Sequence, residues 1–329
     1  MNMINTSGRA LKALAAALAL AMALSVLLLL PGCTQDKQGA APTGQAAGYT
    51  FTDDMGNTVT VESCDAVVAC MGSFANCWEL AGGTLAGASS DAFESYGIGQ
   101  DVANVGDFTA LNLEAIMALD PDFVILTAGT GGRGEDSSQA QVQAQLTEAG
   151  IPAALFKVST FEDYQRMMEI FCAITGDQEA YERNVGSVAS SIESIVASVP
   201  AREQAPTALL AITYSGGIRA QAETTQTGAM LQQLGVENIA VQNRSLLSDF
   251  QMEALLQADP DYIFLISMGN TQEDADKAYK ALVADNPAWQ ELSAVKSGNC
   301  IMLPAEGFLY KPNEKWAESY QTLFDYLYK

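Results

Sequence analysis

Two segments of the chain, 139 residues apart, are near copies of each other. Leu111–Gly129 reads LNLEAIMALDPDFVILTAG, and Phe250–Gly269 reads FQMEALLQADPDYIFLISMG. Each begins with apolar residues spaced i, i+3, i+4, which predicts a short amphipathic helix. Asp-Pro-Asp then ends the helix, because proline disfavours helical backbone in the residue before it. The runs FVILT and YIFLIS that follow are typical of strands buried on both faces. The duplication therefore predicts two similar halves built from α/β units.

The sequence around each copy predicts the rest of a small parallel sheet with covering helices. In the first half we expect strands at 66–70, 84–89 and 151–157, and helices at 75–83 and 137–150. In the second half we expect strands at 207–213 and 299–303, and helices at 227–235 and 273–284.

Between the halves the pattern predicts two consecutive helices. Ser159 or Thr160 can cap the first, Gly176 ends it, and Asp177 can cap the second. The second helix, 177–199, carries apolar residues at spacings of three and four, and Pro200 stops it. A helix of this length spans about 30 Å, so we expect a rigid strut between two lobes. The predicted organisation is an N-terminal α/β lobe at 49–158, a helical connector at 159–200 and a C-terminal α/β lobe at 201–329.

The first 32 residues are typical of a secretory signal. Arg9 and Lys12 precede an 18-residue apolar run from Ala13 to Leu30. The LPGC that follows resembles a bacterial lipobox, whose cysteine carries the lipid anchor, here Cys33. The alternative is a transmembrane span, since 18 residues lie at the short end of the required length. Residues 33–48 are small and polar, which predicts a flexible tether. We therefore expect an extracytoplasmic protein anchored to the cell membrane.

Composition excludes several classes of function. The net charge of −23 disfavours nucleic-acid binding, which needs a basic surface. Histidine is absent, which excludes Ser-His-Asp and Cys-His catalysis and imidazole as a metal ligand. No acid/base or nucleophile motif stands out, so we expect no enzyme and no resident cofactor or metal.

The cysteines beyond Cys33 do not form the tight pairs of a zinc site. We expect small buried side chains, with one possible disulfide among Cys64, Cys70 and Cys77. Whether Cys172 and Cys300 pair with any of these three stays open. Because five is an odd number, at least one of the five cysteines is free or paired outside the chain.

Several segments in order along the chain resemble one family. FTDDMGNTVTV is similar to its opening hairpin, and VGDFTALNLEAIMALDPDFVIL to its most recognisable motif. LLQQLGVENIA and NPAWQELSAVKSGNCIMLP resemble later parts of its second lobe. The chain thus resembles the substrate-binding proteins of ABC importers for ferric siderophores, haem and cobalamin. This resemblance implies two Rossmann-like lobes, with small parallel sheets, joined by one long rigid helix.

The resemblance also implies a role for Glu114 and Glu253. In relatives, one acidic residue at this point of each lobe docks onto arginines of the membrane permease. Helical geometry agrees, because each Glu follows an apolar residue by about 100° and so points toward solvent. The alternative is that each Glu only complements its helix dipole. The matched pair favours docking to a permease dimer with its ATPase.

Ligands of open α/β sheets bind at the carboxyl ends of the strands, which we expect to face an inter-lobe cleft. The candidates there are aromatic, sulfur-containing or cationic, which suits a large planar or anionic ligand. They are Phe74, Trp78, Phe93, Tyr96, Arg133, Tyr214, Arg219, Met268, Phe308 and Tyr310. Core packing is the alternative for each aromatic residue.

The function predicted from these observations is a monomeric, membrane-anchored receptor that delivers a metal chelate to an ABC permease. A ferric siderophore is the first choice, because it brings its own oxygen ligands to a protein without histidine. Cobalamin and haem are the alternatives within this fold, and an extracytoplasmic enzyme or an adhesin are the alternatives from other classes.

Overall fold

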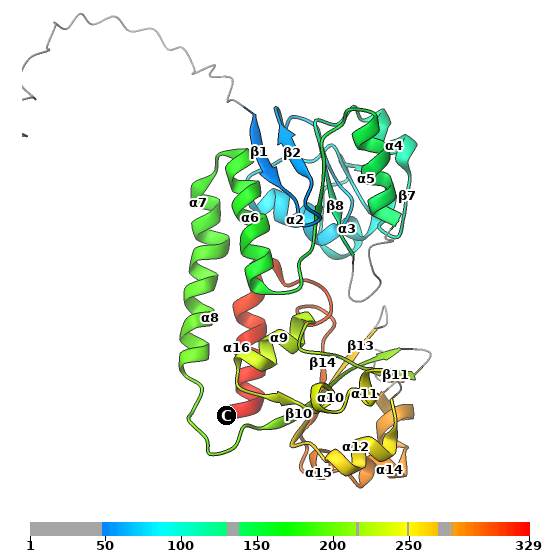
Figure 1. Ribbon diagram of the computed structural model, residues 1–329, viewed down its shortest axis with the longest axis vertical. Coiled ribbons are helices and arrows are strands. Elements are labelled where there is room, and N and C mark those ends of the chain that lie inside the picture. The colour runs from blue at the N-terminus through cyan, green and yellow to red at the C-terminus, as the bar shows by residue number, and fades with distance from the viewer. Residues whose placement is uncertain (1–47, 130–137, 215–216, 249, 269–276, 278) are drawn as a thin grey trace, which may run out of the picture. The chain divides into compact units, whose positions relative to one another are not determined.

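The computed structural model describes residues 48–129, 138–214, 217–248, 250–268, 277 and 279–329. Residues 46–329 form one compact unit. Its chain builds two five-stranded sheets, each covered by helices, and two small hairpins (Figure 1). No helix among the described residues is both long and apolar enough to cross a bilayer.

The first sheet is parallel throughout, in the order β5-β4-β3-β8-β9. Its strands are β3 (Val67–Ala69), β4 (Gly87–Ala88), β5 (Ala103–Asn104), β8 (Phe123–Thr127) and β9 (Ala153–Phe156). Its helices are α2 (Gly72–Leu80), α3 (Ser90–Ser95), α4 (Leu113–Ala118) and α5 (Ser138–Glu148). A hairpin of β6 (Gly106–Asp107) and β7 (Ala110–Leu111) precedes α4.

The second sheet has the order β11-β10-β13-β14, with β12 also pairing β10. Its strands are β10 (Thr207–Tyr214), β11 (Gly217–Ala220), β12 (Glu237–Asn238), β13 (Tyr262–Ser267) and β14 (Cys300–Leu303). The sequence predicts a small parallel sheet here, and β10, β12, β13 and β14 pair in parallel. The edge strand β11 departs from this pattern, since it pairs antiparallel with β10, with Gly217 opposite Tyr214.

Short helices complete the second lobe. They are α9 (Gln226–Gln233), α10 (Ile239–Gln242), α11 (Ser245–Ser248), α12 (Met252–Ala258), the π-helix η2 (Lys280–Ala284), α14 (Pro287–Gln290) and α15 (Ser293–Lys296). The 3₁₀ turn η3 (Asn313–Lys315) leads into the last helix, α16 (Trp316–Tyr328).

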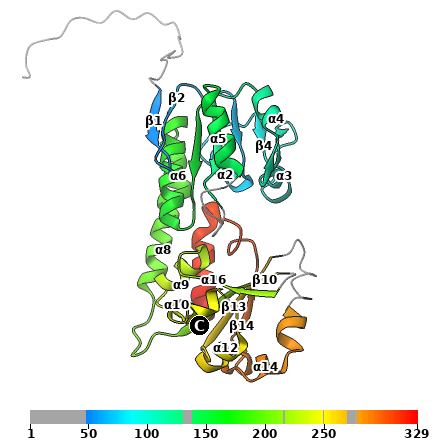
Figure 2. The ribbon, with the colours of Figure 1, turned by 45° about the vertical axis from the view of Figure 1, so that its right-hand side comes forward.

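The helices that connect the two sheets along the chain have the predicted caps. Thr160 caps α6 (Phe161–Thr175) in a capping box with Asp163, and Gly176 ends it with a left-handed backbone. The side chain of Asp177 accepts a hydrogen bond from the Ala180 backbone and starts the next helical run. This run consists of α7 (Gln178–Tyr181), the π-helical turn η1 (Glu182–Gly186) and α8 (Ser187–Ala197). In both views α8 and α16 lie side by side and in contact (Figures 1 and 2).

One contiguous apolar core, here called the shared core, includes residues from both sheets. From the first sheet it takes alternate strand residues such as Phe123 and Ile125, and from the second Leu210 and Phe264. Helices α6, α8 and α16 contribute the residues between them, and Phe161 meets Trp316 edge to face at 6.0 Å. The opposite face of each sheet has a core of its own. It contains Val124 and Leu126 in the first lobe, and Ile263 and Leu265 in the second. The two halves are therefore joined by buried side chains as well as by the backbone.

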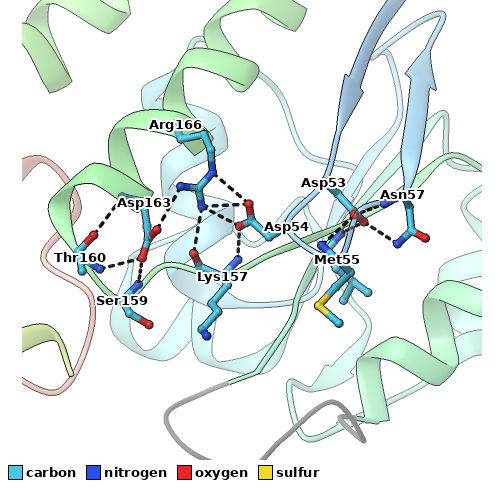
Figure 3. A network of polar contacts seen from close by, with 10 residues as sticks. Asp53, Asp54, Met55, Asn57, Lys157, Ser159, Thr160, Asp163 and Arg166 are labelled. Carbon is cyan, nitrogen blue, oxygen red and sulfur yellow. Dashed lines mark hydrogen bonds and ion pairs between the residues drawn. The ribbon is translucent and has the colours of Figure 1, made fainter. Parts of the chain in front are cut away.

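The opening hairpin is fastened to the first lobe by charge-assisted hydrogen bonds. Strands β1 (Tyr49–Thr52) and β2 (Thr58–Val61) pair antiparallel, as the resemblance implied. Figure 3 shows Arg166 of α6 between two carboxylates, with nitrogen–oxygen distances of 2.9 Å to Asp54 and 3.1 Å to Asp163. The Asp54 carboxylate also accepts a 2.6 Å hydrogen bond from the Lys157 backbone, just after β9. The hairpin, β9 and α6 thus share one polar anchor.

The duplicated Asp-Pro-Asp has the same structural role in both lobes. Asp120 and Asp259 adopt positive φ angles of 47° and 37°, which end the preceding helix. The carboxylate of Asp122 accepts hydrogen bonds from the backbone of Asp65 and Ala66, at 2.8 and 2.9 Å, just before β3. Asp261 accepts from the backbone and hydroxyl of Thr207, both at 2.8 Å, at the start of β10. In each lobe the motif ties the repeat to the first parallel strand.

We expect Asp122→Ala to lower the free energy of unfolding by about 1–2 kcal/mol, because two backbone N–H groups lose their acceptor. Asp65→Ala is the matched control, since it removes a neighbouring carboxylate and leaves the backbone N–H groups bonded. Urea unfolding measures both variants. Equal losses in the two would contradict the assigned role of Asp122.

Candidate functional site

Three exposed side chains lie at the end of, or in the chain after, parallel strands of the second sheet. Thr213 of β10 pairs with Ser267 of β13, and the Met268 backbone donates a 2.8 Å hydrogen bond to the Thr213 carbonyl. Tyr214 and Met268 therefore leave adjacent strands at the same edge. They are 39% and 46% exposed, and Tyr310, in the loop after β14, is 44% exposed. Large apolar side chains with this exposure at the carboxyl edge of a sheet can supply contact area to a ligand.

The loop that carries Tyr310 is held by the start of α9. The Gln226 amide donates to the carbonyls of Gly307 and Tyr310, and the Thr227 hydroxyl donates to that of Phe308 at 2.6 Å. The Tyr310 backbone closes the loop by donating to the Ala305 carbonyl. These bonds fix the backbone of the loop that carries Tyr310 to the start of α9.

Arg219 lies on the edge strand β11, opposite Ile212 of β10, and is exposed. Its guanidinium has no carboxylate partner within the part of the chain that the structure describes. It can therefore offer charge-assisted hydrogen bonds to an anionic group.

Phe93 and Tyr96 of the first lobe are half-buried, in and directly after α3. The pKa of the Tyr96 hydroxyl is raised, first by burial and then by the nearby Cys77, Asp91 and Tyr310.

Phe74, Trp78 and Phe308 are buried core residues, the alternative that was open for each aromatic candidate. Phe74 and Trp78 are fully buried in the shared core, where the Trp78 indole donates to the Thr84 carbonyl at 2.9 Å. Their spacing with Ala81 is helical (i, i+4, i+7), the pattern of a buried face that the strand-end argument overlooked. Phe308 packs in the same core, beneath the loop that exposes Tyr310.

Two other predicted residues, Arg133 and the lipidation candidate Cys33, lie outside the described residues. The described cysteines, Cys64, Cys70, Cys77, Cys172 and Cys300, are all free thiols, so the possible disulfide is absent. Among the same residues no group of three or more cysteine or carboxylate side chains is arranged to hold a metal ion.

Lys311 and Asn313, which the sequence argument did not single out, bridge the two lobes. The Lys311 amine donates a 2.7 Å hydrogen bond to the Val158 carbonyl of the first lobe. The Asn313 amide donates to the Ser73 carbonyl at 3.0 Å and to the Asn76 side chain at 2.7 Å. Asn313 has a φ of 50°, a backbone conformation that asparagine tolerates better than most residues. The segment that follows Tyr310 is thus bonded to the other lobe.

Glu114 and Glu253 are exposed, on α4 and α12 respectively. Their helices occupy equivalent places in the two lobes, because each leads into the strand that pairs in parallel with the first parallel strand of its sheet.

Two open cavities lie elsewhere in the second lobe. One, of about 400 Å³, lies at the amino ends of the strands, where it is lined by residues such as Arg202, Asp261 and Asn299. The other, of about 180 Å³, is lined by residues that include Glu223 and Arg244. Neither is lined by a predicted ligand-binding residue.

Comparison with known proteins identifies the family. The profile of a family described as periplasmic binding protein matches residues 67–306, most of the two lobes. The chain belongs to this family. Its members are binding proteins rather than enzymes, and they act outside the cytoplasm.

The periplasmic binding protein family includes relatives at low sequence identity. The chain is 24% identical over 287 residues to the Fe(3+)-citrate-binding protein YfmC of Bacillus subtilis (strain 168), covering 84% of this chain and 86% of that one. Among solved structures it resembles the siderophore-binding protein BauB in complex with acinetobactin and ferric iron. That match has a TM-score of 0.67 at 16% identity and covers 86% and 99% of the two chains. Haem-bound IsdE of S. aureus matches with a TM-score of 0.64 at 17% identity, covering 80% and 99%. These likenesses confirm the predicted two-lobed α/β fold.

Stability should depend on pH through Lys311. Burial lowers the pKa of its amine from 10.5 to about 8, against the opposing effects of Cys77 and Asp163. Between these values the unfolded chain binds more protons than the folded one, so the free energy of unfolding rises with pH. We expect Lys311→Met to remove this rise while keeping an unbranched apolar stem. Chemical unfolding at several pH values from 7 to 10.5 measures the free energy of unfolding of both proteins. The same pH dependence in the variant and in the unaltered protein would refute the effect assigned to Lys311.

Proposed function

We propose that this protein is a membrane-anchored receptor of an ABC importer that captures a ferric chelate, a siderophore in the first place. The observation that carries the proposal is the exposure of Tyr214 and Met268 at the carboxyl ends of the adjacent strands β10 and β13, together with exposed Tyr310 in the loop after β14. Arg219 on the edge strand β11 adds a cation that has no carboxylate partner among the described residues. Rings and a thioether offer apolar area to the organic part of a chelate, and the guanidinium offers hydrogen bonds to its carboxylate or catecholate oxygens.

The names of the relatives support an iron cargo. The Bacillus subtilis relative is a ferric citrate-binding protein, and BauB holds a ferric siderophore. A chelate brings its own oxygen ligands for iron, so its receptor does not need the histidines that this chain lacks. The cargo is substrate and not a resident cofactor.

Haem is the second candidate, and a specific observation favours it. Methionine and tyrosine side chains can ligate haem iron, and Met268, Tyr214 and Tyr310 are each exposed at or after strand ends of the second sheet. Cobalamin is the third candidate of the same fold, and it requires no protein ligand to its metal.

Binding can be measured by thermal unfolding with ferric citrate, ferric siderophores, haemin and cobalamin, because a ligand that binds only the folded protein raises the Tm. We expect Arg219→Ala to weaken an anionic ferric chelate roughly 10–100-fold through loss of charge-assisted hydrogen bonds. Tyr310→Ala should weaken any of the cargoes through loss of contact area.

Arg244→Ala and Tyr326→Ala are the matched controls, since both side chains are exposed and outside the candidate site. Unchanged affinity of Arg219→Ala for every chelate that binds would exclude an anionic ligand at β11. A Tm that none of the four cargo classes raises would overturn the proposed cargo.

Membrane attachment through Cys33 is part of the proposal. Lipidation of this cysteine after removal of residues 1–32 would leave residues 33–48 as the tether. We expect Cys33→Ser to prevent lipid attachment and signal removal, so that metabolic labelling with a palmitate analogue is lost. Undiminished labelling would refute lipidation at this position.

The delivery partner we propose is a permease dimer with its ATPase, met by Glu114 and Glu253. Both carboxylates are exposed and one belongs to each lobe, which suits a partner with matching two-fold symmetry. We expect Glu114→Ala/Glu253→Ala to abolish uptake of the cargo by cells and to leave the cargo affinity of the purified protein unchanged. The control Glu193→Ala/Glu203→Ala removes two exposed carboxylates elsewhere. Normal uptake by the first double variant would contradict docking through these residues.

A further inference from the structure

The two helices of the duplicated segment, α4 and α12, expose an apolar side chain as well as a glutamate. Residue by residue, 113–118 of α4 and 252–257 of α12 have the same sequence of burial: half-buried, exposed, half-buried, buried, exposed, exposed. The buried position is Ile116 in one helix and Leu255 in the other, each within the core of its own lobe. The two helices are thus seated on their sheets in the same way.

The fifth position of this pattern is a large apolar side chain in both lobes. Met117 is 45% exposed and Leu256 is 37% exposed. Each follows its glutamate by three residues, a spacing that puts the two side chains on the same face of the helix. A single exposed apolar residue on a surface needs no explanation. The recurrence at equivalent positions of a duplicated element, beside an exposed carboxylate each time, indicates a binding surface.

We propose that Met117 and Leu256 are apolar anchors of the permease-docking surface, each inserting into a pocket beside the cation that meets the neighbouring glutamate. This inference rests on the proposed docking of Glu114 and Glu253 and adds the groups that hold the complex once it has formed. Charged pairs at the rim of an interface mainly set its association rate, whereas desolvated apolar anchors mainly set its dissociation rate.

Charge identifies the occupant of this surface. Helices α4 and α12 carry Glu114 and Glu253 and no lysine or arginine, and the exposed Asp120 and Asp259 follow them. An anionic lipid surface would be repelled, and so would a second copy of the same acidic face. The partner that fits is a protein with two equivalent sites, each an apolar pocket bordered by arginine or lysine.

Two double variants separate the two kinds of contact. Met117→Ala/Leu256→Ala removes the apolar anchors and retains helix propensity, and Glu114→Gln/Glu253→Gln removes the charges. The partner is the permease–ATPase complex that requires this protein for uptake, reconstituted in nanodiscs. Biolayer interferometry at several salt concentrations gives the association and dissociation rates.

We expect the apolar variant to dissociate about tenfold faster, with its association rate and salt dependence unchanged. The charge variant should associate more slowly and lose most of its salt dependence. Met117→Leu/Leu256→Met should restore slow dissociation, because it conserves apolar volume. Met55→Ala/Tyr326→Ala, which truncates two exposed apolar residues elsewhere, should bind like the unaltered protein.

An unaltered dissociation rate for the apolar variant, with the charge variant behaving as expected, would overturn this inference and leave the proposed docking intact. Unaltered binding by both double variants would overturn the docking itself.

Discussion

The relation between the two lobes depends on the shared core more than on the connecting helix. Residues from both sheets, from α6 and α8 and from the returning helix α16 pack into one contiguous apolar cluster. Separating the lobes would expose this surface to water, at a cost of about 25 cal/mol for each Å² of apolar area. The hydrogen bonds of Lys311 and Asn313 add polar links next to Tyr310. A receptor built in this way holds its candidate ligand-binding residues in place before the ligand arrives.

The duplicated segment combines two separate tasks within a short stretch. Asp122 and Asp261 bond the chain before the first parallel strand, and Ile116 and Leu255 fill the outer cores, so these positions serve the fold. The glutamates and the apolar residues three positions later contribute nothing to either core, and both are exposed to water. Folding alone explains the first group, and the proposed permease partner with two-fold symmetry would account for the repetition of the second group.

Periodicity predicted the fold well because the buried strands and amphipathic helices of this chain are strongly patterned. The repeat, the capped helices and the exposed glutamates were all readable from spacing alone. The candidate site was harder to predict, since a loop aromatic after a strand can face the core or the ligand. Phe74 and Trp78 belong to a helical face that starts directly after β3, and Phe308 lies under its own loop. The antiparallel strand β11 was missed because Gly217–Ala220 is too short to carry a pattern. Lys311 and Asn313 act through tertiary contacts that no local pattern records.

The distance between the lobes in solution tests the account most directly. Spin labels introduced as non-cysteine amino acids at the exposed Gln100 of the first lobe and Ser297 of the second would leave the native thiols untouched. Pulsed electron paramagnetic resonance should give one narrow distance distribution without ligand, and the same distribution when ferric chelate is bound. A broad or two-peaked distribution that sharpens and shifts on binding would show a hinged receptor and contradict the role assigned to the shared core.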